Sequence, residues 1–487
     1  MSKIVNNANK SIYCVTIVIL SLGIIIRFLA ALKFPFWLDE ATYFFISKNR
    51  IIDILFSNHT NVTQPPLYTL ILHYWQQINT SEIFLRLPSL LFSAITLIFS
   101  YFIGKSIIDS FFGFLLLVIF SFSNFLITLS WQANVYALVI MFTVISIYLY
   151  FFRLRGKFSL ILILAVNLLG FLSDYSFFWL IFCFFILELI IYSIDYRNRN
   201  YFTDRIFKIK AIIFTYFFIL LWAILVINRI PEALSSSAWL TFDNMVSNTL
   251  KAFAGISKKF DIKVILYLIL AVFGLITGLK IRNRNKKYFF LFSIISVFLP
   301  FTVIFVFSFL IQPIMIGRHL HLVAISLLIG LAYLTYYFRN VYSLIFMCLF
   351  IFLSVSGLPD LARMDTFTFD WRVAGKFIHD EMILDQHTTN IFINIENKQY
   401  FFFPLSYYLS RYNEITEKKF YVPEYVNDYF THNKKLDIGE RSSLWLFIDT
   451  DQYQKLFKFQ KNLGCDKNRN YQIEHYRFLN CVYIVSS

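Results

Sequence analysis

The sequence predicts a polytopic α-helical membrane protein followed by a small α/β domain, and three observations carry that prediction. Of the 487 residues, 58% are hydrophobic and only 15% are charged, whereas soluble globular domains carry roughly 25% charged residues. Apolar runs close to the roughly 20 residues that cross a bilayer recur throughout residues 1–357. From residue 358 to 487 these runs shorten and charges become more frequent. A single anchored soluble domain is therefore excluded.

The apolar runs predict eleven membrane-spanning helices. The first run follows Lys3 and Lys10 and contains Arg27. It is longer than the apolar centre of a typical signal peptide, so we expect a retained signal-anchor. The predicted spans are residues 11–32, 83–104, 108–128, 134–152, 158–172, 176–193, 209–227, 262–279, 288–311, 318–338 and 341–357.

The placement of the positive charges predicts the orientation. The formal net charge is +15, but Lys and Arg gather in the short connections around residues 105, 153–157, 197–208, 280–287 and 339, as the positive-inside rule describes. This placement argues against nucleic acid as a partner. It puts the N-terminus in the cytoplasm, and it puts the loop 39–82, the turn 129–133, the loop 229–261 and the domain 358–487 outside. The richness in Phe, Ile, Asn and Lys suggests an AT-rich bacterial genome, and we expect the protein in the bacterial plasma (inner) membrane.

The last 130 residues read as alternating strands and helices. Strands are predicted at 390–395, 443–448 and 478–485, and helices at 369–382, 404–412 and 452–463. This alternation favours an α/β domain, and its sequence contains no Gly-rich phosphate loop. Cys465 and Cys481 could form a disulfide if the domain is extracytoplasmic; the sequence leaves this open.

An adjacent pair of acids, Asp39 and Glu40, follows Trp37 where the first apolar run ends. The structural explanation is a helix start, where acids are favoured by the helix dipole. The functional explanation is a general base at the membrane interface, beside aromatic residues that lower the local dielectric. Two adjacent acids suit base catalysis or cation binding. Residues 40–50 and 66–78 both have the apolar spacing of interfacial amphipathic helices.

Further polar groups fall on the same predicted side. Gln64, Pro65, Pro66 and Tyr68 belong to a Pro-Pro turn, which either starts a helix or brings that helix beneath Asp39. Glu82 and Arg86 are four residues apart, so they form a local ion pair or orient the base and contact a phosphate. Gln132 lies between Trp131 and Tyr136, which an aromatic belt explains without any function. Ordinary surface packing explains Trp371 and Arg372 at least as well as a site does. The Arg318 side chain, next to His319, either extends its charged end to the membrane surface or binds an anionic phosphate.

Taken together, these motifs resemble the GT-C superfamily of polytopic glycosyltransferases, in particular the bacterial family 39/83 branch related to protein O-mannosyltransferases and aminoarabinose transferases. The matching segments are Trp37-Leu38-Asp39-Glu40, Pro65-Pro66-Leu67 and the run from Glu82 to Ser89. The segment 130–138, Arg318 and Trp371-Arg372 resemble later family motifs. Gln64 and Gln132 depart from the pattern, where many members have His and an acid.

The resemblance implies a polyprenyl-phosphate-linked sugar as donor and catalysis on the outer face. Asp39 would deprotonate an acceptor on a glycolipid, glycan or protein, and attack on the anomeric carbon would proceed with inversion. Arg318, assisted by His319 or Arg86, would stabilise the leaving phosphate. No cofactor is required, although some members use a divalent cation, for which Asp39 and Glu40 are the candidate ligands.

Two other classes of function stay open. A transporter or flippase for polyprenyl-linked glycans would place ionisable groups near the bilayer midplane, whereas here they cluster at the outer ends of spans. A glycan ligase or polymerase, or an inactive scaffold, would share the same topology.

Overall fold

The computed structural model describes most of the first 338 residues and parts of the rest. The described residues are 2–56, 65–153, 156–195, 199–226, 245–246, 249–250, 252–253, 262–311, 314–338, 350, 371–372, 376, 388–393, 404, 407–408, 410–411, 442–447, 471–476 and 481–486. The chain forms two compact units. Unit 1 comprises Met1–Lys33 and Ile46–Ala362, and unit 2 comprises Phe34–Phe45 and Arg363–Ser487. The predicted boundary near residue 358 falls outside the described residues.

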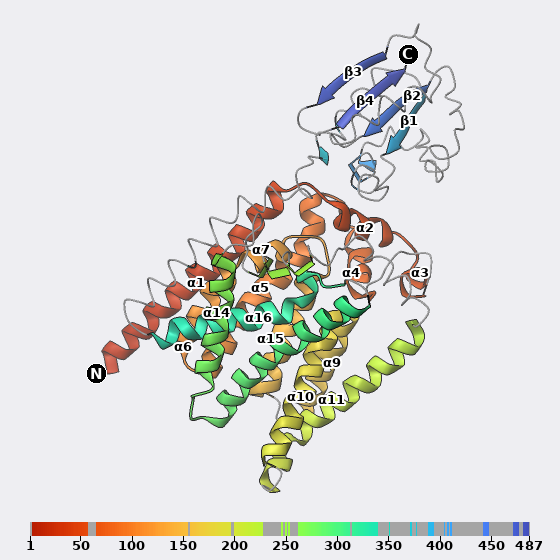
Figure 1. The fold of residues 1–487 in the computed structure, drawn as a ribbon. Coiled ribbons are helices and arrows are strands. Elements are labelled where there is room, and N and C mark those ends of the chain that lie inside the picture. The colour runs from red at the N-terminus through yellow and green to blue at the C-terminus, as the bar shows by residue number, and fades with distance from the viewer. Residues whose placement is uncertain are drawn as a thin grey trace. The chain divides into compact units, whose positions relative to one another are not determined.

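Unit 1 is a bundle of long apolar helices (Figure 1). Their bounds are α1 Ser2–Lys33, α5 Glu82–Ile107, α6 Ser110–Phe122, α7 Asn124–Ser130, α8 Tyr136–Tyr148 with a π-helical end η1 Leu149–Arg153, α9 Lys157–Ser173, η2 Tyr175–Phe177, α10 Phe178–Asp195, α11 Arg199–Val226, α14 Ile262–Gly278, α15 Arg284–Leu310, η4 Gly317–Leu320 and α16 His321–Tyr337. Short helices α3 Ile51–Phe56 and α4 Leu67–Trp75 follow the first span, and α2 Leu38–Ile46 begins in unit 2.

The helices show that the chain is a multi-pass membrane protein. In the described part of the chain, seven helices are long and apolar enough to cross a bilayer, or eight if α6 and α7 form one span. Helices occupy ten of the eleven predicted spans, but α9 and α14 are shorter apolar helices. The last predicted span, 341–357, lies almost entirely outside the described residues. The number eleven therefore stays a prediction.

The third predicted span is broken rather than straight. Helices α6 and α7 meet at Ser123 at an angle of 63°, although no Pro or Gly stands at the break. Arg27 of α1 is buried, and its guanidinium donates hydrogen bonds of 2.9 Å to the carbonyls of Phe120 and Ser121. These carbonyls belong to the last turn of α6, where backbone carbonyls have no hydrogen-bond donor within the helix. Arg27 thus caps the broken helix in a region where water cannot do so.

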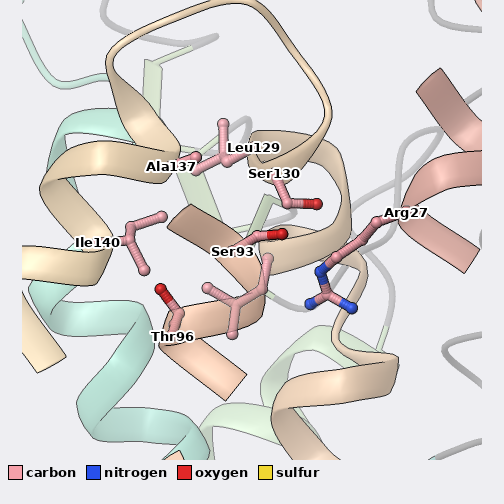
Figure 2. Close-up of a pocket in the computed structure, with 8 residues that line it drawn as sticks. Arg27, Ser93, Thr96, Leu129, Ser130, Ala137 and Ile140 are labelled. Atoms are coloured by element: carbon pink, nitrogen blue, oxygen red, sulfur yellow. The ribbon is translucent and has the colours of Figure 1, made fainter. Parts of the chain in front are cut away.

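The capping arginine also lines a small pocket. Figure 2 shows Arg27 entering from one side, Ala137 and Ile140 of α8 on the opposite side, and Ser93 and Ser130 between them. Helix α7 ends at Ser130, one of the residues that line this pocket, and a turn follows it. That turn contains Gln132 and leads into Tyr136, the first residue of α8.

Helices α14 and α16 cross at a pair of glycines, and we expect this crossing to tolerate no side chain. A Cβ on Gly274 would overlap the carbonyl oxygen of Gly330, because small residues let membrane helices approach backbone to backbone. Gly274→Val should therefore lower the free energy of unfolding by about 1–3 kcal/mol, measured by thermal unfolding in detergent. The matched control is Ile276→Phe on the exposed side of the same helix. Equal stability of the two variants would contradict the close approach.

A buried ion pair joins α10 and α11. Nη1 of Arg205 lies 2.8 Å from both carboxylate oxygens of Glu188, and the hydroxyl of Tyr150 donates to the same carboxylate. Arg205 also lies over the ring of Tyr288 at 5.1 Å. The carboxylate is thus held by donors from two neighbouring elements, as a buried charge requires.

Unit 2 contains four described strands: β1 Thr388–Ile393, β2 Ser442–Phe447, β3 Tyr471–Tyr476 and β4 Cys481–Ser486. β1 pairs with β2 in parallel, Thr388 opposite Ser442. β3 pairs with β4 antiparallel, and β2 also lies beside β4 (Figure 1). The three predicted strands are confirmed within one to three residues, but β3 was not predicted because Gln472, Glu474 and His475 dilute its apolar pattern. Most residues of the predicted helices, and Cys465, lie outside the described residues.

Candidate active site

The acidic pair forms the first turn of α2. Glu40 is completely buried, and its Oε2 accepts a hydrogen bond from the backbone nitrogen of Trp37 at 3.3 Å. This is the reach-back half of a capping box, in which an acid satisfies a backbone donor at the helix start. Asp39 is only half-buried. The two neighbouring acids therefore lie in different surroundings, and Asp39 is the one with exposed surface.

Aromatic side chains of the C-terminal part of the chain hold the segment before α2. The backbone nitrogen of Phe36 donates to the hydroxyl of Tyr408 at 2.7 Å, and the Phe36 ring stacks on Tyr407 at 4.3 Å. Arg372 donates to the carbonyl of Phe34 at 2.8 Å, and Trp371 is buried. These contacts explain why residues 34–45 belong to unit 2. Arg372 thus holds the backbone of the segment that leads to the two acids.

The different surroundings of the two acids lead to a testable difference. In Glu40→Gln, the amide oxygen still accepts the Trp37 N–H, so we expect stability close to wild type. Glu40→Ala removes the acceptor and should cost about 1 kcal/mol, as loss of a helix cap does. Thermal unfolding of the two purified variants measures the difference. Equal losses in both would show that the buried carboxylate is needed for its charge and not for the cap.

Arg86 is fully buried in α5 of unit 1. Its Nη1 donates to the carbonyl of Ala31 at 2.7 Å, and its guanidinium lies over Trp131 at 4.9 Å. The predicted pairing with Glu82 is present at 4.0 Å, the long limit for an ion pair. The carbonyl of Ala31 belongs to the last turn of α1, so Arg86 caps that helix as Arg27 caps α6.

The Pro-Pro turn leads directly into α4. Pro66 is the residue before the helix, and both Pro65 and Pro66 are buried, whereas Gln64 lies outside the described residues. Tyr68 is fully buried and its hydroxyl lies 3.1 Å from Oγ of Ser89. The predicted motifs around Pro65 and Glu82 are thus linked through a hydrogen bond between two buried hydroxyls. Gln132 is also buried, in the turn before α8.

Arg318 and His319 lie in η4, at the start of α16, beside Tyr136. The guanidinium of Arg318 lies 5.5 Å from the centre of the Tyr136 ring, and the His319 ring meets the same ring edge to face at 5.9 Å. One buried aromatic side chain therefore packs against both cationic candidates. The predicted neighbours Tyr136, Arg318 and His319 come together in unit 1.

Sequence reasoning missed Asp174, which lies between α9 and α10 and belongs to the same cluster. Its Oδ2 is 3.7 Å from Nδ1 of His319, while Oδ1 accepts the backbone N–H of Ser176 at 2.7 Å. Burial works to raise the pKa of Asp174, but the contacts with His319 and Ser176 outweigh it and hold that pKa at about 2. The available signal was an acid in a short turn between two apolar runs.

The site residues fall into two groups, one in each compact unit. Unit 2 contains Trp37, Asp39, Glu40, Trp371 and Arg372. Unit 1 contains Tyr68, Glu82, Arg86, Gln132, Tyr136, Arg318 and His319. Within the residues that the structure describes, no group of three or more His, Cys, Asp or Glu side chains gathers into a metal site. A divalent cation held by Asp39 and Glu40 stays a prediction.

The helical bundle defines the class of the chain: a polytopic membrane protein. The chain is similar in structure to ArnT, the aminoarabinose transferase of Cupriavidus metallidurans solved with undecaprenyl phosphate bound. The TM-score is 0.56 at 11% identity, covering 96% of this chain and 97% of ArnT. The predicted resemblance is thereby confirmed at the level of the fold.

A second solved structure supports the same fold. The archaeal oligosaccharyltransferase AglB from Archaeoglobus fulgidus, in complex with an inhibitory peptide and a dolichol-phosphate, gives a TM-score of 0.50 at 10% identity. The similarity covers 82% of this chain and 64% of AglB. A scan of protein-family models gave no match, and neither did a sequence comparison with curated proteins.

Proposed function

We propose that this protein is a membrane glycosyltransferase that moves a sugar from a polyprenyl-phosphate donor to an extracytoplasmic acceptor, with inversion at the anomeric carbon. The observation that carries the proposal is the fold similarity to ArnT along almost the whole of both chains. ArnT was solved with undecaprenyl phosphate and AglB with dolichol-phosphate. Both neighbours therefore hold a lipid phosphate of the kind that the proposed donor contains.

Asp39 is the proposed general base. Asp39 is half-buried whereas Glu40 is completely buried, so Asp39 is the acid with surface to meet an acceptor hydroxyl or amine. It takes the proton as the acceptor attacks the anomeric carbon and the bond to the phosphate oxygen breaks. The acceptor is a glycolipid, a polysaccharide or a protein.

Arg318 and His319 are the proposed phosphate-binding groups. Both are donors that pack against the buried ring of Tyr136, so they are held in place before the reaction begins. Fixed donors stabilise charge that develops in the transition state more effectively than water does. We assign Arg86 the supporting role of capping α1, since its hydrogen bond goes to a backbone carbonyl.

The proposed topology follows the charge pattern. The topology has eleven spans, a cytoplasmic N-terminus and an extracytoplasmic α/β domain in a bacterial plasma membrane. In this topology the proposed base and the proposed phosphate-binding groups lie on the outer side. The parallel pairing of β1 with β2 supports the α/β domain, because parallel strands need a long crossover connection, usually a helix.

The test is a transfer assay combined with envelope analysis. A deletion strain should lose one sugar from an envelope acceptor and accumulate the corresponding polyprenyl-linked donor, both seen by mass spectrometry. The purified protein should transfer that sugar from the lipid-linked donor to the acceptor isolated from the deletion strain. Accumulation without any transfer by the purified protein would favour a flippase, and an unchanged envelope would contradict the proposal.

A further inference from the structure

Asp174 is a buried acid to which the proposed reaction gives no role. It is 2% exposed, and it begins the helical turn η2, where its Oδ1 accepts the Ser176 N–H. Within the described part of the chain, its Oδ2 has no hydrogen-bond partner. A buried carboxylate oxygen left without a donor is costly and requires an explanation.

The group opposite that oxygen is His319. Nδ1 of His319 lies 3.7 Å from Oδ2 of Asp174, which is slightly too long for a hydrogen bond. Catalytic hydrogen bonds are often long without substrate and shorten when substrate binds. His319 is 25% exposed in its side chain, and no residue in the described ranges hydrogen-bonds its other ring nitrogen, Nε2. One edge of the ring thus faces a buried anion while the other edge stays without a described protein partner.

The other groups around His319 do not replace this anion. Arg318 from the same turn is positive, and Tyr136 of α8 contributes its ring. His321 is buried between two hydroxyls: Nε2 lies 3.0 Å from Thr143 and Nδ1 lies 3.4 Å from Ser176. Because the Thr143 hydroxyl donates to the Val139 carbonyl, it accepts from Nε2 of His321. His321 thus supplies no negative charge, and Asp174 is the anion that faces His319 among the described residues.

We propose that Asp174 is a positioning residue that holds the His319 ring in place, so that His319 and Arg318 together bind a phosphomonoester. The inference rests on the proposed function, and it goes further by naming the residue that positions the phosphate-binding histidine. The sugar–lipid phosphodiester carries one negative charge, whereas the released lipid phosphate carries about −1.5 to −2. The acceptor proton goes to Asp39, the electrons of the broken bond stay on the phosphate oxygen, and the donors of Arg318 and His319 meet the added charge.

The experiment measures binding of undecaprenyl phosphate to the purified full-length protein at one fixed pH, with the uncharged polyprenyl alcohol as the probe that lacks phosphate. Asp174→Asn should weaken binding of the phosphate and leave binding of the alcohol unchanged, because the amide removes the buried carboxylate that faces the His319 ring. In a His319→Lys background, Asp174→Asn should change phosphate binding little, since no imidazole is left for Asp174 to position.

The matched control is Asp109→Asn, since Asp109 also begins a helix, where its Oδ1 accepts the Phe112 N–H. It should leave binding of both probes unchanged. A folded Asp174→Asn protein with wild-type affinity for the phosphate would overturn the proposal, as would an equal loss of affinity when Asp174→Asn is added to His319→Lys. If the loss is present but no sugar is transferred, the role of Asp174 holds and the proposed function fails. If transfer occurs without any loss, the function holds and the role of Asp174 fails.

Discussion

Asp39→Asn is expected to lower the rate of sugar transfer by about 10²- to 10⁴-fold, the contribution of a positioned general base. The amide has nearly the same size as the carboxylate but cannot accept the acceptor's proton. Because Asp39 is half-buried and Glu40 provides the hydrogen bond at the start of α2, the fold should be retained. The measurements are single-turnover transfer by the purified protein and the envelope glycan profile of the complemented deletion strain.

The matched control for this substitution is Asp53→Asn. Asp53 pairs with Arg50 at 2.8 Å in the first turn of the short helix α3, where Arg50 is largely exposed, and such surface pairs contribute little. Full rescue of the deletion strain by the control and none by Asp39→Asn, at equal protein level, would support the base assignment. Rescue by Asp39→Asn would refute it and make transport or scaffolding the better account.

Arg27→Met is expected to have the largest effect on stability. The change removes the donors that satisfy the carbonyls of Phe120 and Ser121 at the end of α6, and the methionine leaves these groups unpaired in an apolar interior. A cost of at least about 3 kcal/mol follows, since hydrogen bonds to a charged group are worth roughly 1.5–3 kcal/mol each. Thermal unfolding in detergent and the yield of folded protein measure this loss.

The control is Arg50→Met, which makes the same chemical change at an exposed arginine and should leave unfolding unchanged. Arg27→Lys should fall between the two, because one ammonium group cannot reproduce the fork that reaches two successive carbonyls. A wild-type unfolding curve for Arg27→Met would show that the break at Ser123 is held by something other than this cap.

The positions of the membrane helices were predictable from the sequence because the length of an apolar run is set by the bilayer. The break between α6 and α7 was not, since the residues around Ser123 include no Pro or Gly. The end of α6 at this break is capped by Arg27, about ninety residues earlier in the chain. A contact at that separation leaves no local pattern in the sequence. The presence of Arg27 in an apolar run was visible, but its partners were not.

The candidate site was predictable in part for a similar reason. Acids at a helix start and cations at a span end are local features, so Asp39, Glu40, Arg318 and His319 could be singled out. Their surroundings could not, because Glu40 and Asp39 look equivalent in the sequence and differ only in burial. Asp174 could not be singled out from the sequence, because its partner His319 lies far away along the chain. Nothing in its own turn distinguishes it from an ordinary polar connection.

The buried pair of Glu188 and Arg205 has a consequence for how this protein enters the membrane. The two residues are only seventeen positions apart, so they emerge from the ribosome almost together. A lone charge costs about 2.5–3.5 kcal/mol at the centre of a spanning helix and less toward its end, where Glu188 and Arg205 lie in the predicted topology. Pairing with Arg205 lowers the cost of inserting Glu188, which favours entry of α10 and α11 into the bilayer as one hairpin.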